Sequence, residues 1–228
     1  NKLRTFLTGF SISWGIFMFC ILLSSGNGLR NGLTSNFGSR SVNSVQYWGR
    51  STSIPYKGLP NKRSVKLSDK DLHLLNTQTS QADKISPILY TDQAISYQNY
   101  NTGSSSLVGV YPDYVHINGI TIKDNLGRFI NDFDIKENRK VAVVNERLCE
   151  ILFRDENPLG KLILAGGLSY TVIGVYKEST WGQEEKAYIP FSTAQSLYGN
   201  GSDIHEISFI VKDLHTKHEN EAFEKILR

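Results

Sequence analysis

Residues 6–23 read FLTGFSISWGIFMFCILL, and no charged side chain occurs between Thr5 and Leu29. A hydrocarbon layer about 30 Å thick needs roughly 20 helical residues at about 1.5 Å each. A secretory signal peptide with Lys2 and Arg4 as its basic start is the alternative. However, its apolar core would be unusually long, and the LSSGNG that follows is not an A-x-A-like cleavage site. The sequence therefore predicts a transmembrane helix over residues 1–27, with span residues Phe6, Phe10, Trp14, Phe17, Ile21 and Leu22.

A helical stalk is expected beyond the span, over residues 28–39. Its apolar side chains recur at i, i+4 and i+8, although three glycines in this region weaken a helix by about 1 kcal/mol each. Residues 216–228 also have apolar residues at helical spacing and predict a final helix. We expect the two helices to pack side by side through Leu29, Leu33 and Phe37 on one and Phe223, Ile226 and Leu227 on the other.

The charge is unevenly distributed along the 228 residues, whose formal net charge is +3. Residues 1–68 carry nine Lys or Arg and no acid, whereas residues 69–228 carry sixteen basic and 22 acidic residues, a net charge of −6. The basic stretch could face anionic lipid headgroups or an acidic partner, or form a solvated surface. Its charges are spread out and follow a membrane span, which excludes nucleic-acid binding. Cys20 in the span and Cys149 in a predicted helix are not expected to form a disulfide.

The first part of the soluble region predicts a βαβ-type unit. A strand is expected around residues 44–48 and another over residues 85–90. Between them, Ser68 and Asp71 fit a capping box that opens a helix with Leu72 and Leu75 on one face. Two further β-runs, residues 94–100 and 107–111, flank NTGSS and predict a hairpin with an exposed tip.

A β-rich block follows, over residues 120–198, and a last strand is expected over residues 206–212. The predicted elements of the block are a strand at 141–145, a helix at 146–153 and strands at 162–164, 170–176 and 187–190. Gly166 and Gly167 form a hairpin turn. Trp181 lies in a polar loop at residues 180–186. An exposed Trp favours binding or local packing, so the candidate partner contacts are Asn101, Ser104 and Trp181.

No constellation of catalytic or metal-ligating residues stands out. The motifs HExxH and GxSxG, a glycine-rich phosphate loop and a Walker Lys-Ser/Thr pair are all missing from the sequence. His215 and His218 are close together, but no third metal ligand can be identified for them. Asp132 and Asp134 could suggest a carboxylate pair, and we interpret them as turn and surface residues. The sequence predicts no catalytic residue, no metal and no cofactor.

Seven short motifs succeed one another along the chain. They are NKLRTFLT with the span and its exit GNGLRNGL, GVYPDY at 109–114, GRFI at 127–130 with Asp132 and Asp134, KVAVV at 140–144, PLGK at 158–161, YTVIGV at 170–175 and YIPF at 188–191 with Thr193–Gln195. In this order they resemble the MacB-like periplasmic core domain of ABC-transporter permeases. Asn145 stands where that family often has Gly, and Tyr170 where Phe is usual. Gly127, Gly160 and Gly174 are suited to tight turns or close backbone approach.

The resemblance implies an α+β fold in which an N-terminal transmembrane helix is followed by a two-lobed periplasmic domain. One lobe is a porter-like βαβ lobe, and a β-rich, sabre-like lobe is inserted into it. The expected layout is transmembrane helix 1–27, stalk 28–39, porter-like lobe 40–118 and 204–228, and sabre-like lobe 119–203. The strand at 206–212 and the last helix repeat the βα character of the early segment, which is why the first lobe is discontinuous.

The resemblance also implies a function. A permease subunit of a MacB-type ABC transporter would sit in the bacterial inner membrane, with its soluble domain in the periplasm, and transmit ATP-driven conformational change to periplasmic efflux or export. Its implied partners are the lipid bilayer, a cytoplasmic ABC ATPase subunit or domain, a second permease copy in a homodimer and, for exporting members, a periplasmic adaptor with an outer-membrane duct. ATP hydrolysis would take place on a nucleotide-binding domain outside this chain.

Two other functions fit the same pattern of a span and a soluble α/β region. One is the membrane-tethered extracytoplasmic sensor domain of a signalling receptor, and the other is a single-span anchored binding or enzyme module. The only methionine is Met18, so we expect the chain to be a piece of a longer protein. Three further apolar spans after Arg228 would support the permease.

Overall fold

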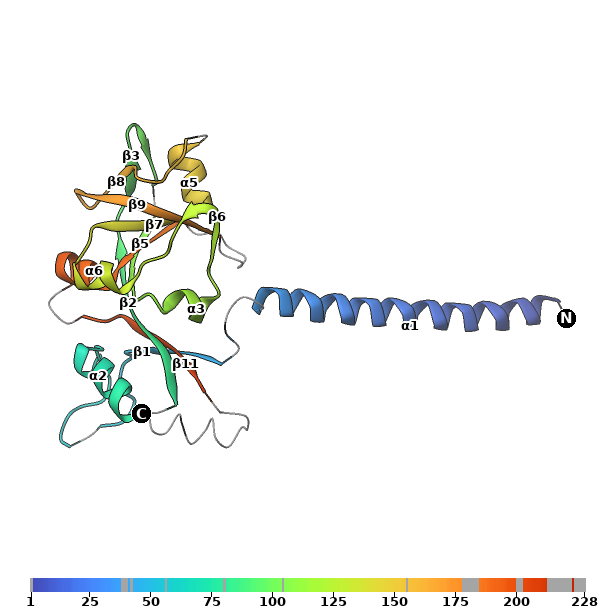
Figure 1. The fold of residues 1–228 in the computed structure, drawn as a ribbon. Helices are drawn as coiled ribbons and strands as arrows, with labels where there is room; N and C mark the ends of the chain where they lie inside the picture. Colours follow the sequence, from blue (N-terminus) through green and yellow to red (C-terminus); the bar gives the residue numbers. More distant parts are fainter. Residues whose placement is uncertain are drawn as a thin grey trace. The chain divides into compact units, whose positions relative to one another are not determined.

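The computed structural model describes residues 2–37, 41, 43–55, 57–79, 81–103, 105–154, 156–177, 185–199, 203–212 and 223 (Figure 1). The chain divides into two compact units, residues 1–39 and 40–228. Each is described by itself.

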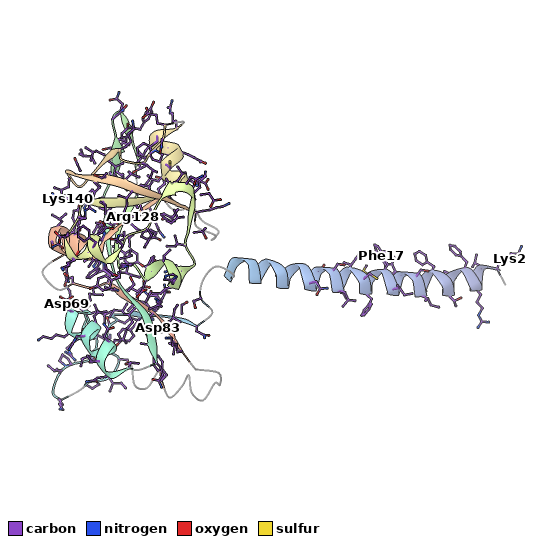
Figure 2. The ribbon with its side chains drawn as sticks, viewed as in Figure 1. Lys2, Phe17, Asp69, Asp83, Arg128 and Lys140 are labelled. Carbon is purple, nitrogen blue, oxygen red and sulfur yellow. The ribbon has the colours of Figure 1, made fainter. Side chains whose placement is uncertain are left out.

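The first unit is the helix α1, Lys2–Phe37. Among the described residues, it is the one helix long and apolar enough to cross a membrane, with a candidate span over Lys2–Leu29. The predicted span residues are exposed along it, as Phe17 is in Figure 2. Two polar side chains are satisfied within the helix, because Thr8 Oγ1 donates to the Arg4 carbonyl (3.1 Å) and Ser11 Oγ to the Leu7 carbonyl (2.9 Å). This internal pairing suits lipid, which offers no hydrogen-bond partners.

The second unit begins with a three-stranded sheet and one helix. These elements are β1 (Ser44–Trp48), α2 (Asp69–Gln78), the first half of β2 (Ala82–Asp92) and β11 (Glu206–Val211). The capping box at Ser68 is present, with its backbone N–H donating to Asp71 Oδ2 (2.8 Å), and Leu72 and Leu75 are buried as predicted. The βαβ unit is split, because β11 lies between β1 and β2 and runs antiparallel to both.

The rest of the unit continues the same sheet in the order β2-β5-β10-β7-β9-β8-β3-β4, with β6 paired to β9. The strands are β3 (Ile95–Tyr97), β4 (Tyr100–Asn101), β5 (Ser106–Val110), β6 (Thr121–Gly127), β7 (Val141–Asn145), β8 (Leu162–Ala165), β9 (Leu168–Lys177) and β10 (Lys186–Pro190). The helices are α3 (Tyr114–Asn118), α4 (Asp132–Lys136), α5 (Glu146–Phe153) and α6 (Phe191–Tyr198). The pairs β5–β10 and β7–β9 are parallel. Parallel strands are usually covered on both faces, and all of β7 is indeed buried.

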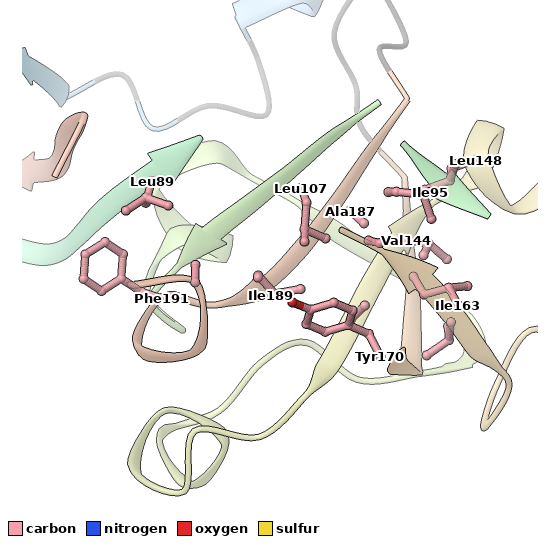
Figure 3. Packing of buried hydrophobic residues seen from close by; sticks show 14 of the residues in the cluster. Leu89, Ile95, Leu107, Val144, Leu148, Ile163, Tyr170, Ala187, Ile189 and Phe191 are labelled. Carbon is pink, nitrogen blue, oxygen red and sulfur yellow. The ribbon is translucent and has the colours of Figure 1, made fainter. Parts of the chain in front are cut away.

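Two apolar clusters form the core. Figure 3 shows part of the larger one, in which Leu107 and Ile189 from the sheet lie between Leu148 of α5 and Phe191 of α6. The smaller cluster is built on alternate residues of the same strands, such as Val108 and Tyr188, together with α3. The alternation of side chains along each strand therefore sends neighbouring residues into separate clusters.

The predicted hairpin between residues 94–100 and 107–111 is wrong. Strand β3 turns back after two residues to pair with β4, whereas β5 pairs with β2 and β10. Asn101 and Gly103 of the NTGSS segment are exposed, but the segment is anchored at two points, because Ile95 N–H donates to the hydroxyls of Thr102 and Ser105 (both 3.1 Å). Both hydroxyl residues are buried. Long-range pairing of β5 has overridden the local hairpin signal.

The proposed two-lobe layout stays a prediction, although the strand pairings bear on its boundary. Strand β11 pairs with β1 and β2 and with no strand of the 119–203 block that the structure describes. In contrast, β3 and β5 pair with β8 and β10, which belong to that block. Residues 95–110 are thus joined by backbone hydrogen bonds to the predicted second lobe.

Gly174→Ala tests the close backbone approach of β6 and β9. A Cβ on Gly174 would lie 2.2 Å from the Arg128 carbonyl oxygen, and neither backbone can retreat without breaking strand pairing. We expect the free energy of unfolding, measured by urea denaturation of the full chain in detergent, to fall by about 3 kcal/mol. The control is Gly103→Ala, where a Cβ has open space, and the change should stay within about 0.5 kcal/mol. Equal effects of the two substitutions would contradict the argument.

Candidate functional site

Strand β2 connects the two parts of the sheet without a break. Residues 82–88 pair with β11, and residues 89–92 pair with β5 (Figure 1). A displacement of the three-stranded part must therefore act on the larger part through a hydrogen-bonded strand rather than through a flexible linker. We call the region where β2 changes partner the junction.

A buried carboxylate lies at the junction. Glu206, at the start of β11, is 2% exposed and stands opposite Trp48 of β1. Its Oε2 accepts hydrogen bonds from Trp48 Nε1 (3.0 Å) and from the Tyr90 hydroxyl (2.8 Å), and its Oε1 accepts one from Ser208 (2.8 Å). Because Tyr90 belongs to the half of β2 that pairs with β5, one carboxylate connects both parts of the sheet. These four residues are called the junction cluster.

The two aromatic rings of the junction cluster are held in place but remain at the surface. Trp48 is 46% and Tyr90 is 40% exposed. His205 stacks on the Tyr90 ring (centroids 6.2 Å apart, planes at 5°), and its Nδ1 accepts the Tyr90 backbone N–H (3.1 Å). The His205 backbone N–H in turn donates to the Ile88 carbonyl (3.0 Å).

A second set of contacts joins α2 and the segment before it to α6 and the segment after it. Gln195 Nε2 of α6 donates to the Asp69 carboxylate at the start of α2 (3.0 Å). Leu67 and Ile204 form an isolated β-bridge. Burial, together with the Asp69 charge, raises the pKa of Tyr111, whose ring meets Phe191 edge-on (centroids 5.5 Å apart). Besides the strand pairing of β2, the two parts are thus connected by the junction cluster and by this α2–α6 contact.

The interpretation of Asp134 as a surface residue is wrong. Its carboxylate has no exposed surface and accepts a two-pronged hydrogen bond from Arg128 (2.6 and 3.0 Å), with Arg139 at 3.4 Å. It also caps α4 by accepting the Asn131 N–H (3.1 Å). Burial opposes ionisation, but the Arg128 hydrogen bonds, the Asn131 N–H and both arginine charges lower the pKa of Asp134 below its usual value. Asp132 is exposed, as predicted.

Asp134→Asn should destabilise the fold by about 3 kcal/mol at pH 7, because it leaves two arginines without their buried partner. The lowered pKa means that this contribution is complete above the unfolded pKa of about 4 and is lost as pH falls through the folded pKa. The difference between wild type and variant in urea denaturation should therefore shrink on acidification. Asp132→Asn, on the same helix, is the control and should change stability little. A pH-independent difference would contradict the ion-pair account.

The other predicted site residues are not brought together by the described structure. Asn101 is exposed on β4, whereas Ser104 and Trp181 lie outside the described residues. Leu29, Leu33 and Phe37 belong to α1, which does continue past the apolar window as predicted. Phe223 is buried against Phe209 of β11 (centroids 6.1 Å apart). Ile226 and Leu227, like His215 and His218, lie outside the described part, so the stalk packing stays a prediction.

The described residues hold no group of three or more His, Cys, Asp or Glu side chains that could bind a metal ion. A hollow of about 180 Å³ lies between α2 and the sheet, lined by Tyr47, Leu75 and Ile207 among others. It is smaller than the roughly 300–1,000 Å³ of typical ligand pockets. What the geometry offers is a mechanical connection between two parts of a sheet, in a chain whose first helix can span a membrane.

The structure defines an α+β domain that follows a helix able to span a membrane, and known proteins of this class match the chain. The family model of the MacB-like periplasmic core domain matches residues 5–225. The chain therefore belongs to this family, which is a component of transporters.

Two similar relatives carry the name macrolide export ATP-binding/permease protein MacB. The protein from Neisseria gonorrhoeae is 27% identical over 220 residues, which cover 93% of this chain and 33% of the relative. MacB 2 of Aeromonas hydrophila is 28% identical over 222 residues, covering 93% and 32%. The chain thus spans about a third of the length of the curated relatives it matches.

Two solved structures share the fold. The periplasmic region of MacB from Actinobacillus actinomycetemcomitans has a TM-score of 0.68 and 22% identity, covering 84% of this chain and 86% of that one. The extracellular domain of the ABC-type transporter YknZ from Gram-positive bacteria has a TM-score of 0.64 and 19% identity, covering 79% and 88%. They support the predicted α+β fold of a MacB-like domain.

Proposed function

We propose that this chain is part of the permease subunit of a MacB-type ABC transporter and transmits ATP-driven conformational change across the inner membrane to periplasmic efflux or export. One observation carries the proposal: a single family match extends over both the candidate span and the domain. The relatives' names join an ATP-binding part to a permease, and this chain corresponds to a third of such a protein. The same match argues against the sensor alternative.

The proposed mechanism is rigid-body transmission. Helix α1 is continuous from the candidate span to Phe37, and β1 begins seven residues later, at Ser44. Force on α1 reaches β1 along this short connection, passes to β11 and β2 by strand pairing, and enters the larger part of the sheet along β2. Packed sheets and helices move as bodies rather than deform continuously. The junction cluster resists bending at the point where β2 changes partner.

The remaining parts of the proposal follow from the family. The domain would lie in the periplasm and the helix in the inner membrane. ATP would be hydrolysed on a cytoplasmic subunit or domain outside this chain, with a second permease copy completing a dimer. A periplasmic adaptor and an outer-membrane duct would receive the exported substrate.

Insertions after Phe37 test transmission in the complete transporter. A seven-residue Gly-Ser insertion should leave folding and ATPase activity near wild-type levels and reduce transport at least tenfold, because a flexible segment relays no tilt. The matched control is an EAAAKAA insertion of equal length, which would prolong α1 as a helix and should retain more transport. Both are measured as substrate efflux and ATP turnover in the same vesicles. Full transport with the Gly-Ser insertion would rule out this mechanism.

Glu206→Gln tests the junction cluster. The amide keeps one acceptor oxygen and replaces the other by a donor, so we expect the free energy of unfolding to fall by about 1 kcal/mol. Spin labels at the exposed Asn76 of α2 and Lys136 of α4, with Cys20 and Cys149 replaced by Ala, report the distance between the two parts. This distance distribution should broaden in Glu206→Gln and stay unchanged in Glu150→Gln, an exposed control on α5. An unbroadened distribution would mean that the cluster does not hold the junction.

A further inference from the structure

The segment between β1 and α2, residues 49–67, forms a hairpin, which we call the basic hairpin; Tyr56 lies outside the described residues. Its arms are joined by backbone hydrogen bonds from Val65 to Arg50 (3.0 Å), Thr52 to Arg63 (2.9 Å) and Lys62 to Thr52 (2.6 Å). Gly49 is required where the arms meet, since a Cβ there would lie 2.1 Å from the Val65 carbonyl oxygen. The hairpin is therefore a defined element of the fold.

The basic hairpin combines positive charge with exposed apolar side chains. It carries five cations and no acid: Arg50, Lys57, Lys62, Arg63 and Lys66. Lys66 of this set forms a long ion pair, with its Nζ 3.9 Å from the Asp203 carboxylate. Ile54 is 75% exposed and Leu59 46% exposed. The hairpin adjoins the exposed aromatic rings of the junction cluster, because the Arg50 guanidinium lies 6.0 Å from the centre of the Trp48 ring.

We propose that the basic hairpin, with Trp48 and Tyr90 beside it, is a docking surface for an acidic face of a partner protein. Carboxylates of the partner would meet the hairpin cations, and an apolar patch among them would cover Ile54 and Leu59. Charge complementarity of this kind steers association and makes it sensitive to salt. Trp, Tyr and Arg are the residues most enriched at the centres of protein interfaces. Here Trp48 and Tyr90 are already oriented by Glu206, so little side-chain freedom is lost on binding.

The strand geometry favours a protein over the bilayer as the partner. The chain enters β1 from α1 at Ser44, whereas the hairpin leaves β1 at Trp48, the other end of the strand, about 14 Å away at roughly 3.4 Å per residue. The hairpin thus starts at the end of β1 opposite to its connection with the candidate span. The exposed rings of Trp48 and Tyr90 lie beside the start of the hairpin and extend the proposed docking surface away from the hairpin tip.

A second copy of this chain is a poorer match than a distinct acidic partner. Several acids of the described domain are already paired with its own lysines, as in Lys84–Asp113, Lys161–Glu156 and Lys212–Asp83. Their charges are partly neutralised and scattered over different elements. A partner with unpaired, clustered carboxylates fits the hairpin better.

Photocrosslinking in intact cells of the source organism tests the proposal. The full-length protein carries p-benzoylphenylalanine in place of Leu59, or in place of Leu164, a control Leu of similar exposure (49%) on β8. We expect Leu59 to give an adduct with one protein, mapped by mass spectrometry to a peptide rich in Asp and Glu, and Leu164 not to give it. An adduct only with phospholipid, with a second copy of this chain or with a peptide lacking net negative charge would overturn the proposal, as would no adduct.

Reversing the charge of the hairpin cations distinguishes specific docking from crosslinking by random collision. In the Leu59 crosslinking protein, K57E/K62E/R63E should reduce the adduct at least fivefold, whereas the matched control K136E/K140E/K177E, at three exposed lysines elsewhere, should not. Thermal unfolding of both variants by circular dichroism verifies that they fold. In isolated membranes, raising NaCl from about 50 to 500 mM should lower the yield similarly. An adduct that survives both charge reversal and salt would contradict the electrostatic account. None of these readouts depends on transport.

Discussion

Strand β2 is the constraint on which the rest of the domain depends, because it pairs first with β11 and then with β5. A strand that changes partner along its length fixes the angle between the sheets it joins, since rotation would break backbone hydrogen bonds on one side or the other. A register shift between Ser208 and Ile210 of β11 accommodates this arrangement. Local irregularities of this kind bend a strand while keeping most of its pairing. The two parts therefore behave as one rigid body, and the junction between them resists bending.

The junction cluster is better understood as orienting than as stabilising. Removing a carboxylate such as Glu206 from water costs several kcal/mol, and its hydrogen-bond donors described here, Trp48, Tyr90 and Ser208, are uncharged. Charge-assisted hydrogen bonds offset much of that cost. An apolar residue would fill the same space more favourably, but it would not hold two aromatic rings from different strands at fixed angles. The proposed roles in transmission and in docking both use that fixed geometry.

Elements whose conformation depends on residues close together in the sequence could be predicted. β1, β7 and α5 have the expected bounds, because an apolar run with suitable flanking residues selects strand or helix over a few residues. The capping box at Ser68 is equally local, since both partners lie within one helical turn. Gly127 and Gly174 were also interpretable, because only glycine tolerates the close backbone approach that their pairing creates. The family resemblance supplied the class of protein.

What escaped prediction depends on contacts distant in sequence. The run at 107–111 has a good local hairpin partner, yet β5 pairs with β2 and with β10 inside the sheet, where its residues from Leu107 to Val110 are buried. Asp134 looks like a turn residue until Arg128 and Arg139 enclose it.

Glu206 carried one usable signal, a charge at the start of the apolar run EISFIV, which indicates a buried acid that needs hydrogen-bond donors. The identity of those donors was unpredictable, because Trp48 and Tyr90 lie 158 and 116 residues away and meet Glu206 only once β11 has inserted between β1 and β2. The insertion that splits the βαβ unit is thus also what creates the junction cluster.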